Sequence, residues 1–279
     1  MSNLYDVYTP IEPSEIGTKG SLYKIPDSWY FDGPGLSKSK LDLIHKAPSK
    51  FECGYEHQDS KEMGIGRLFH SMVLEPETLD RKYIRAPKIN RRTKAGKEEW
   101  QEFMDFAQFK EVVADDDWAT AEGMTETLCS SETYDNFIKG GLNEISVYAN
   151  LVDDVLSRGR IDVINNDSYL IDLKTTKDIT YGSFRNSVEN FRYYVQAAYY
   201  LDLMTEATGI PHDTFLIIAI ERENPFLFKS YVLSPEYIEI GRMEYLQDLH
   251  VYKECLAKND WPGMDQSIEL LEPPKWRNK

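Results

Sequence analysis

The residues best suited to chemistry lie in one short stretch near the middle of the chain. Asp172 and Lys174 are two residues apart in a run that alternates in character, so on a β-strand they would project from the same face. Ile171 and Leu173 would then project from the other face. Asp162 lies on the preceding run, and a turn between the two runs would bring it opposite Asp172. The sequence therefore predicts two carboxylates and one ammonium group close together.

Such a group of side chains could hold a hard divalent cation. Two carboxylates supply the oxygen ligands that this kind of cation prefers, and the ammonium group is left to orient water or to neutralise charge. Hydrolysis of a phosphodiester needs this help, because the phosphate oxygens shield the phosphorus with their negative charge. The same spacing also fits an ordinary ion pair on the surface of a strand, and the spacing alone leaves both interpretations open.

The elements around this stretch predict how these residues are held. From residue 143 onward the apolar residues recur at every second position instead of about every 3.6 positions, which indicates strands. The residues between the first three strands are typical of hairpin turns, so these strands should form an antiparallel meander. The predicted strands cover residues 144–151, 155–164, 169–175, 214–221 and 226–233, and the predicted helices of this half cover 183–208 and 234–259.

The first half of the chain has a helical pattern. Ser37 is a suitable N-cap for a helix that Pro48 stops, and further helices are predicted at 64–74, 94–113 and 115–130. Residues 1–35 contain four prolines and show no sustained period, which predicts an irregular arm that lies on the body. The predicted fold class is therefore α/β or α+β, with a mixed central sheet flanked by helices and a helical N-terminal half.

We expect a single domain over residues 36–260, in which 36–140 form the helical part and 141–260 form the sheet with its helices, followed by a tail over 261–279. A chain of 279 residues can bury a large core without disulfides. Its three cysteines are far apart, which argues against a disulfide scaffold, a zinc knuckle or a four-cysteine iron–sulfur site. These features fit a cytoplasmic protein, and we expect neither a targeting signal nor a membrane span.

Charge is sorted along the chain. The net charge of −15 would normally count against nucleic acid as a partner. Residues 81–100, however, hold eight basic residues against two acids, whereas residues 101–136 hold ten acids against one lysine. The basic segment, residues 81–97, could steer a phosphate backbone. A solvated loop followed by an acidic helix is the alternative, and charge alone favours it.

Several segments resemble a known superfamily, the PD-(D/E)XK nucleases. Asp162 is followed, after nine residues, by Asp172-x-Lys174, which matches the superfamily signature with an aspartate in the (D/E) position. Segments from about residue 36 to residue 200 are also similar, in order, to the RecE (exonuclease VIII) branch. These segments are Leu36–Ser39 with Pro48, Gly66–His70 with Leu74–Pro76, the basic run Arg91–Lys97, and Tyr194–Tyr200. The resemblance implies a restriction-endonuclease-like core.

The resemblance also implies roles for the residues that match. Asp162 and Asp172 would be metal ligands, and Lys174 would position or activate the attacking water. His70 would add a ligand from the helical half, although without the resemblance a histidine beside apolar neighbours is more often a packing residue. Glu144 resembles an acidic residue that precedes the core aspartates in related phage exonucleases, with a hairpin-edge charge as the alternative. The implied cofactor is Mg²⁺, and the nitrogen ligand would let Mn²⁺ substitute.

Other residues are candidates for substrate contacts. Gln196 and Tyr200 are four residues apart on one helix face and could reach the phosphate or the ligands, although Tyr200 could equally pack at the edge of an apolar stripe. Basic residues would touch the DNA backbone, without any implied reading of bases. Those in the basic segment are Arg91, Arg92 and Lys94, and those near the site are Arg158 and Arg160, which could instead pair with Asp153 and Asp154.

The expected function is that of a Mg²⁺-dependent exonuclease acting on the ends of double-stranded DNA. The resemblance implies 5′ to 3′ digestion that leaves 3′ single strands for recombination, in a bacterial or phage-infected cytosol. It also implies a homo-oligomeric ring, with a tetramer as the first expectation, and a single-strand annealing protein as a partner. The alternatives are a structure-specific or CRISPR-type PD-(D/E)XK endonuclease, a non-catalytic DNA-end-binding module, and an acidic helical interaction protein.

Overall fold

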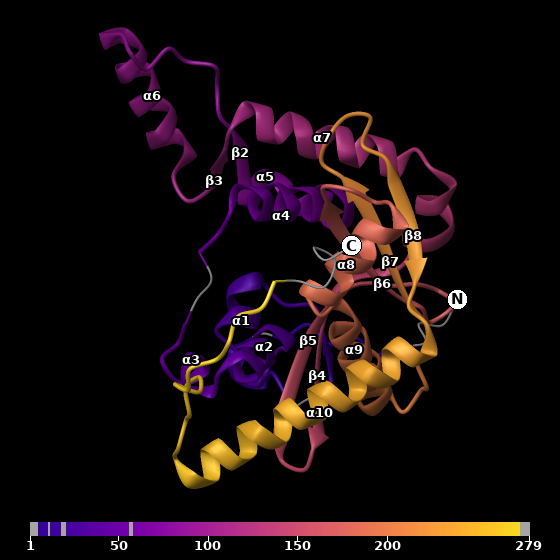
Figure 1. Ribbon diagram of the computed structural model, residues 1–279. Coiled ribbons are helices and arrows are strands. Elements are labelled where there is room, and N and C mark those ends of the chain that lie inside the picture. Colours follow the sequence, from indigo (N-terminus) through magenta and orange to yellow (C-terminus); the bar gives the residue numbers. More distant parts are fainter. Residues whose placement is uncertain (1–4, 11, 18–20, 56–57, 274–279) are drawn as a thin grey trace.

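A six-stranded sheet forms the centre of the molecule (Figure 1). The computed structural model describes residues 5–10, 12–17, 21–55 and 58–273. The strand order is β1-β4-β5-β6-β7-β8; β6 and β7 are parallel, and the other neighbours are antiparallel. The strands are β1 (Leu22–Tyr23), β4 (Leu142–Val152), β5 (Val155–Ile164), β6 (Leu170–Thr176), β7 (Phe215–Glu221) and β8 (Phe228–Val232). This topology confirms the predicted mixed sheet. It also confirms the predicted antiparallel meander, which β4, β5 and β6 form.

Helices cover both faces of this sheet (Figure 1). One buried core lies between the sheet and α9, α10 and α2, and a second lies between the sheet and α4 and α7. We call these the α9-side core and the α4-side core. The helices are α1 (Asp27–Phe31), α2 (Lys38–Lys46), α3 (Pro48–Glu52), α4 (Lys61–Leu74), α5 (Leu79–Lys82), α6 (Lys94–Ala107), α7 (Asp115–Cys129), α8 (Tyr181–Asn190), α9 (Tyr193–Thr208) and α10 (Pro235–Lys258), with short turns η1 (Pro13–Glu15), η2 (Pro76–Thr78) and η3 (Tyr134–Ile138).

The alternation predicted for β6 is present. Ile171 and Leu173 are fully buried in the α4-side core. Asp172 and Lys174 therefore project toward the opposite face, where the side chains of α9 meet the sheet. Local sequence was enough for this placement, because a strand between two helical layers must alternate between two apolar cores.

The predicted helix over 183–208 is wrong as a single helix, since the chain forms α8 and α9 with a break between them. Arg192 lies at the break with a left-handed backbone, at a φ of 52°. Its guanidinium is held by acids from α2 and α10, at 2.8 Å from Asp42, 3.0 Å from Glu244 and 2.8 Å from Asp248. These partners are distant in sequence, so the local periodicity could not show the break.

The predicted helix over 94–113 is also too long. α6 ends at Ala107, and Gln108 follows with a φ of 46°. Residues 111–113 form strand β3 (Glu111–Val113), which pairs in parallel with β2 (Tyr83–Arg85) in a separate small sheet. α6 extends away from the body of the molecule (Figure 1).

The N-terminal arm contributes to the main sheet and to its cover. β1 pairs with β4 at the sheet edge, and α1 is fastened by two arginines of β5. Arg158 donates hydrogen bonds to the backbone carbonyls of Tyr30 and Phe31, and Arg160 pairs with Asp27. Because these contacts join residues more than 120 positions apart, the aperiodic sequence of residues 1–35 gave no sign of them.

Within the described part of the chain, every helix is too short or too polar to cross a lipid bilayer.

Candidate metal centre

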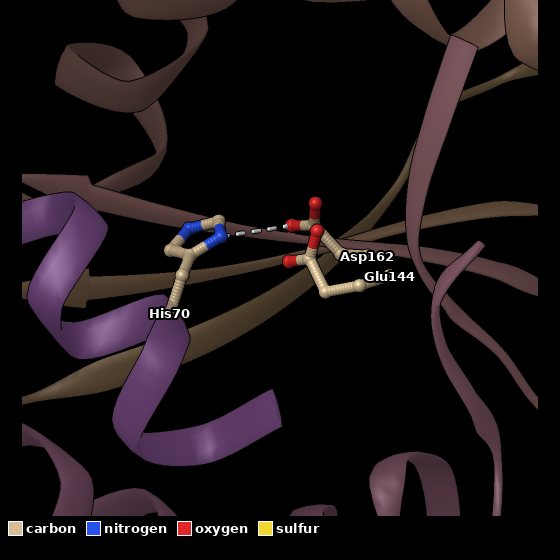
Figure 2. A group of neighbouring side chains, drawn as sticks. All are labelled: His70, Glu144 and Asp162. Carbon is tan, nitrogen blue, oxygen red and sulfur yellow. Dashed lines mark ion pairs between the residues drawn. The ribbon is translucent and has the colours of Figure 1, made fainter. Parts of the chain in front are cut away.

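Three side chains from three different elements converge at one end of the sheet. They are His70 from α4, Glu144 from β4 and Asp162 from β5, and each offers a ligand atom within 4.8 Å of the others. Figure 2 shows the two carboxylates side by side, facing the imidazole ring. The Nδ1 atom of His70 lies 3.5 Å from Oδ2 of Asp162. Two carboxylates and an imidazole form a donor set suited to a divalent cation.

A local distortion of the sheet directs Glu144 and Asp162 toward each other. The β4–β5 register pairs Asn143 with Val163 and Ile145 with Ile161, so Glu144 is opposite Asp162. Glu144 has a φ of 54°, a left-handed conformation that is uncommon for a residue with a side chain. Strain of this kind is kept where the surrounding structure enforces it, which is frequent at functional sites.

Near this distortion, the side chains of β5 change the face of the sheet toward which they project. Ile161 packs in the α9-side core, whereas Val163, two residues later, packs in the α4-side core. Residues two apart on a regular strand share a face, so the strand turns over at Asp162. This turn leaves the Asp162 side chain at the gap where β5 and β6 separate.

At that gap, the carboxylate of Asp162 takes the place of a backbone acceptor for strand β6. Direct pairing of β5 with β6 covers only Val163 with Ile171 and Ile164 with Leu170. Beyond these pairs, the backbone N–H of Leu173 donates to Oδ2 of Asp162 at 2.8 Å. An acid placed here is fixed by the backbone of the neighbouring strand.

His70 is oriented by the same strand. Its Nε2 atom lies 2.9 Å from the carbonyl oxygen of Leu173. A carbonyl oxygen can only accept, so Nε2 carries the proton, and in the neutral ring Nδ1 keeps a lone pair directed toward Asp162. This tautomer, assigned from the hydrogen bond, is the one that could bind a cation through Nδ1.

Asp172 belongs to a neighbouring group rather than to these three residues. It is 3% exposed, with Oδ2 at 2.6 Å from Nζ of Lys174 and Oδ1 accepting a 2.7 Å hydrogen bond from Nε2 of Gln196. The Lys174 ammonium also lies 5.0 Å from the ring centre of Tyr193. The contact expected of Gln196 is present, and in the metal-free chain Asp172 also forms an ion pair with Lys174.

Burial and mutual repulsion set the protonation of the two acids. Burial, and then the negative charge of Asp162, raise the pKa of Glu144 to about 8. Burial also raises the pKa of Asp162; the positive charge of a protonated His70 opposes this rise, and the negative charge of Asp172 reinforces it. Two adjacent, half-buried carboxylates therefore retain a proton near neutral pH until a positive charge replaces it. Because the two carboxylates need a positive charge beside them, the three side chains fit a bound cation.

Lys174 remains protonated. Burial alone would lower the pKa of its ammonium group, but the negative charges of Asp172 and Asp162 and the neighbouring Tyr193 outweigh burial and raise the pKa. A protonated amine cannot take a proton from water. Lys174 can therefore orient a water molecule or a phosphate oxygen and offset charge.

Two cavities adjoin the three converging side chains. The first, of about 360 Å³, is lined by α1, α4 and the strand residues Glu144, Arg160 and Asp162, and we call it the α1-side cavity. The second, of about 610 Å³, is lined by α4, Lys174 and the start of α8, and we call it the α8-side cavity. Gly66 and His70 line both cavities. The candidate metal ligands are thus accessible from the α1-side cavity, and Lys174 is accessible from the adjoining α8-side cavity.

Tyr200 lines the α1-side cavity and packs closely on β5. A side chain at Gly159 would meet the Tyr200 ring at 2.8 Å, so the glycine makes room for the ring. Burial raises the pKa of Tyr200 well above its usual range, and its hydroxyl therefore stays protonated as a donor.

The predicted DNA-contacting residues are divided between two places. Arg158 is 2% exposed and donates to backbone carbonyls, so the structure gives it a structural role in place of the expected phosphate contact. Arg160 pairs with Asp27, and neither arginine pairs with Asp153 or Asp154 among the contacts of the described residues.

The other three predicted residues, Arg91, Arg92 and Lys94, precede or begin the projecting helix α6. Arg91 stacks over the Trp100 ring at 4.4 Å, and the Lys94 side chain is largely exposed. Within the described residues, neither cavity lining includes any of these three.

Acids from α7 neutralise part of the basic segment. Arg85 donates to Asp115 at 2.7 Å and also pairs with Glu122, and Lys88 lies 2.8 Å from Asp115. The charge sorting seen in the sequence is therefore partly an internal pairing between the basic segment and the first turns of α7.

Sequence reasoning missed the wall that α1 builds beside the site. Asp27, Tyr30 and Phe31 line the α1-side cavity, and Tyr193 covers Lys174 on the other side. The residues of α1 lie in an aperiodic, proline-containing segment, so no spacing signal pointed to them. Tyr193 lies next to the recognised Tyr194–Tyr200 segment, and that proximity was the one available signal.

Known proteins share the architecture of this chain. Residues 39–273 match a family model described as a PDDEXK-like domain of unknown function, DUF3799. A crystal structure of a "putative exonuclease" from Eubacterium rectale is similar with a TM-score of 0.62 at 15% identity, covering 91% of this chain and 97% of that chain. The structure of SSO0001 matches at 14% identity over 78% of this chain and 88% of that chain, with a TM-score of 0.29 that is too low to indicate a common fold. None of the curated proteins matches the chain.

We expect Mg²⁺ binding to release protons at pH 7 and to weaken as the pH falls further below 8. The pKa of Glu144 is raised to about 8, so the metal-free site is protonated at neutral pH and the cation must displace that proton. Titration calorimetry in two buffers of different ionisation enthalpy measures the number of protons released. Glu144→Gln should abolish the release, whereas Glu206→Gln, on α9 outside both cavity linings, should retain it. Binding without proton release in the unchanged chain would contradict this account.

Proposed function

This chain belongs to the DUF3799 family of PDDEXK-like domains, and from that premise we propose that it is a metal-dependent nuclease that hydrolyses phosphodiester bonds of DNA. The assignment to the PD-(D/E)XK superfamily, made from Asp162, Asp172 and Lys174, is confirmed at the level of the family and the fold. The RecE-like branch stays a prediction. The observation that carries the proposal is the convergence of His70, Glu144 and Asp162 beside the Asp172–Lys174 pair.

We assign the cation to the three converging side chains. Their donor set accepts Mg²⁺, and the imidazole nitrogen of His70 makes Mn²⁺ an acceptable substitute. When bound, the cation would offset negative charge on the phosphate and make a water molecule more acidic. Asp172, which the signature also predicts as a ligand, contacts Lys174 and Gln196 in the metal-free chain and can hold both in place.

The two cavities suggest the path of the substrate. A phosphodiester placed next to His70 would have the α1-side cavity on one side and the α8-side cavity on the other. The protonated Lys174 faces this position from the second cavity and can hold a phosphate oxygen or the attacking water by hydrogen bonds. Positioning and charge neutralisation are the two contributions required for phosphoryl chemistry.

The finer features of the proposal come from the resemblance to RecE-like exonucleases. We propose digestion from ends of double-stranded DNA in the 5′ to 3′ direction, leaving 3′ single strands for recombination in a bacterial or phage-infected cytosol. Assembly into a ring, with a tetramer as the first expectation, and cooperation with a single-strand annealing protein belong to the same proposal. A ring would allow an acidic chain to enclose DNA through locally basic surfaces.

Asp162→Asn and Asp172→Asn should each lower hydrolysis by at least about 100-fold while DNA is still retained, because the first removes a metal ligand and the second releases Lys174. The measurement uses duplex DNA labelled at either end, incubated with Mg²⁺. Mononucleotides released from one end support the exonuclease, and internal cuts support an endonuclease instead. Asp213→Asn, a change of an exposed acid that bonds only to Thr214 among the described contacts, is the matched control. Cleavage by Asp162→Asn at the rate of the unchanged chain would refute the site.

The basic segment makes a separate contribution that salt can isolate. Replacing Arg92 and Lys94 together by glutamine should weaken DNA binding and flatten the plot of log affinity against log salt concentration by about 2 units, because each phosphate contact releases a counterion. The matched control replaces two exposed lysines, Lys139 and Lys258, which pair with acids one helical turn away. A slope equal to that of the unchanged chain would remove Arg92 and Lys94 from the DNA path.

A further inference from the structure

The α1-side cavity has an aromatic feature that the proposed hydrolysis does not use. Phe31, the last residue of α1, lies on the cavity wall with 68% of its surface exposed, whereas the adjacent Tyr30 is 7% exposed. The two rings meet edge to face, with centres 5.4 Å apart. A large exposed ring on the wall of a polar site offers an uncovered apolar surface to a flat ligand.

The strand that carries Asp162 also fixes the backbone that bears this ring. Arg158, on β5, donates to the carbonyl oxygens of Tyr30 and Phe31, the latter at 3.1 Å. Arg160, also on β5, lies with its guanidinium 4.4 Å from the centre of the Tyr30 ring. A backbone held by a buried guanidinium loses little further freedom when a ligand binds. The backbone position of Phe31 relative to Asp162 is therefore set before any substrate arrives.

The charges in this cavity favour a flat apolar group over a phosphate. Three cationic side chains line the cavity, but each is already paired with a carboxylate, so none is left to attract an anion strongly. The partners are Asp59 for Arg67 at 3.0 Å, Asp27 and Glu75 for Lys82 at 2.9 and 2.8 Å, and Asp27 for Arg160. Phe31 is the large side chain of the lining that remains most exposed.

We propose that Phe31 is a stacking site for one unpaired nucleobase of the DNA strand that is cut. The inference rests on the proposed nuclease function and adds to it a substrate contact. Every nucleobase has a flat face that can stack on an aromatic ring, so the contact would be independent of sequence. A base inside a duplex has both faces covered by its neighbours, so the base on Phe31 must come from an end of the strand, and we assign it to an unpaired base of a frayed end. Phe31 is then a positioning residue for the nucleotide beside the scissile phosphate.

The test compares the unchanged chain with Phe31→Ala and Phe31→Trp on DNA substrates that carry one abasic nucleotide at successive positions. Phe31→Ala should raise KM for the intact substrate by about 10-fold and leave kcat within about twofold, and Phe31→Trp should restore KM. At one position, removal of the base should raise KM for the unchanged chain but have no further effect in Phe31→Ala, because the stack is already lost. A purely structural role for Phe31 would not produce this dependence on one base.

Phe109→Ala is the matched control, since its ring is fully exposed and lies outside the cavity lining. It should leave KM unchanged, and thermal unfolding should show that each variant is folded. Equal KM values for Phe31→Ala and the unchanged chain, or an abasic penalty that persists in Phe31→Ala, would overturn this inference while the nuclease function stands. If the unchanged chain with Mg²⁺ neither cuts nor retains DNA, the proposed function fails and this inference fails with it.

Discussion

Two carboxylates held side by side in a partly buried position are the constraint on which the rest of the site depends. Burial and the charge of Asp162 raise the pKa of Glu144, and burial with the charge of Asp172 raises the pKa of Asp162. The fold holds them there through a strained backbone at Glu144 and a hydrogen bond from Leu173 to Asp162. Such an arrangement costs stability in the metal-free chain, and a bound divalent cation would remove that cost and so gain affinity.

Strand β5 connects this constraint to the remainder of the molecule. It carries Asp162 at its end, and Arg158 and Arg160 further back bind the N-terminal arm. The arm becomes one wall of a cavity whose other wall is α4, the helix of His70. A displacement of β5 would therefore move the candidate ligand Asp162 and a cavity wall together, so the site and its entrance are mechanically linked.

The sequence predicted the parts that depend on local pattern. Alternation placed Asp172 and Lys174 on one face of β6, and the hairpin residues gave the meander that brings Asp162 beside that strand. The resemblance supplied His70 and Glu144, which neither spacing nor composition could assign to a site. Their convergence also depends on a left-handed residue in β4, and no side-chain periodicity signals that conformation.

What the sequence could not show arises from contacts between distant segments. The break at Arg192 depends on acids from α2 and α10, and the wall formed by α1 depends on guanidinium groups from β5. The contacts of Asp172 with Lys174 and Gln196 arise in the same way, and its role as a metal ligand stays a prediction. Side-chain partners of this kind are set by tertiary packing, which local propensity does not encode.

The most direct measurement is an anomalous difference map from crystals of this chain saturated with Mn²⁺. We expect one strong peak bonded to Nδ1 of His70 and to carboxylate oxygens of Glu144 and Asp162. Saturated crystals with no peak among these three side chains, or with a peak that His70 and Glu144 do not touch, would contradict it.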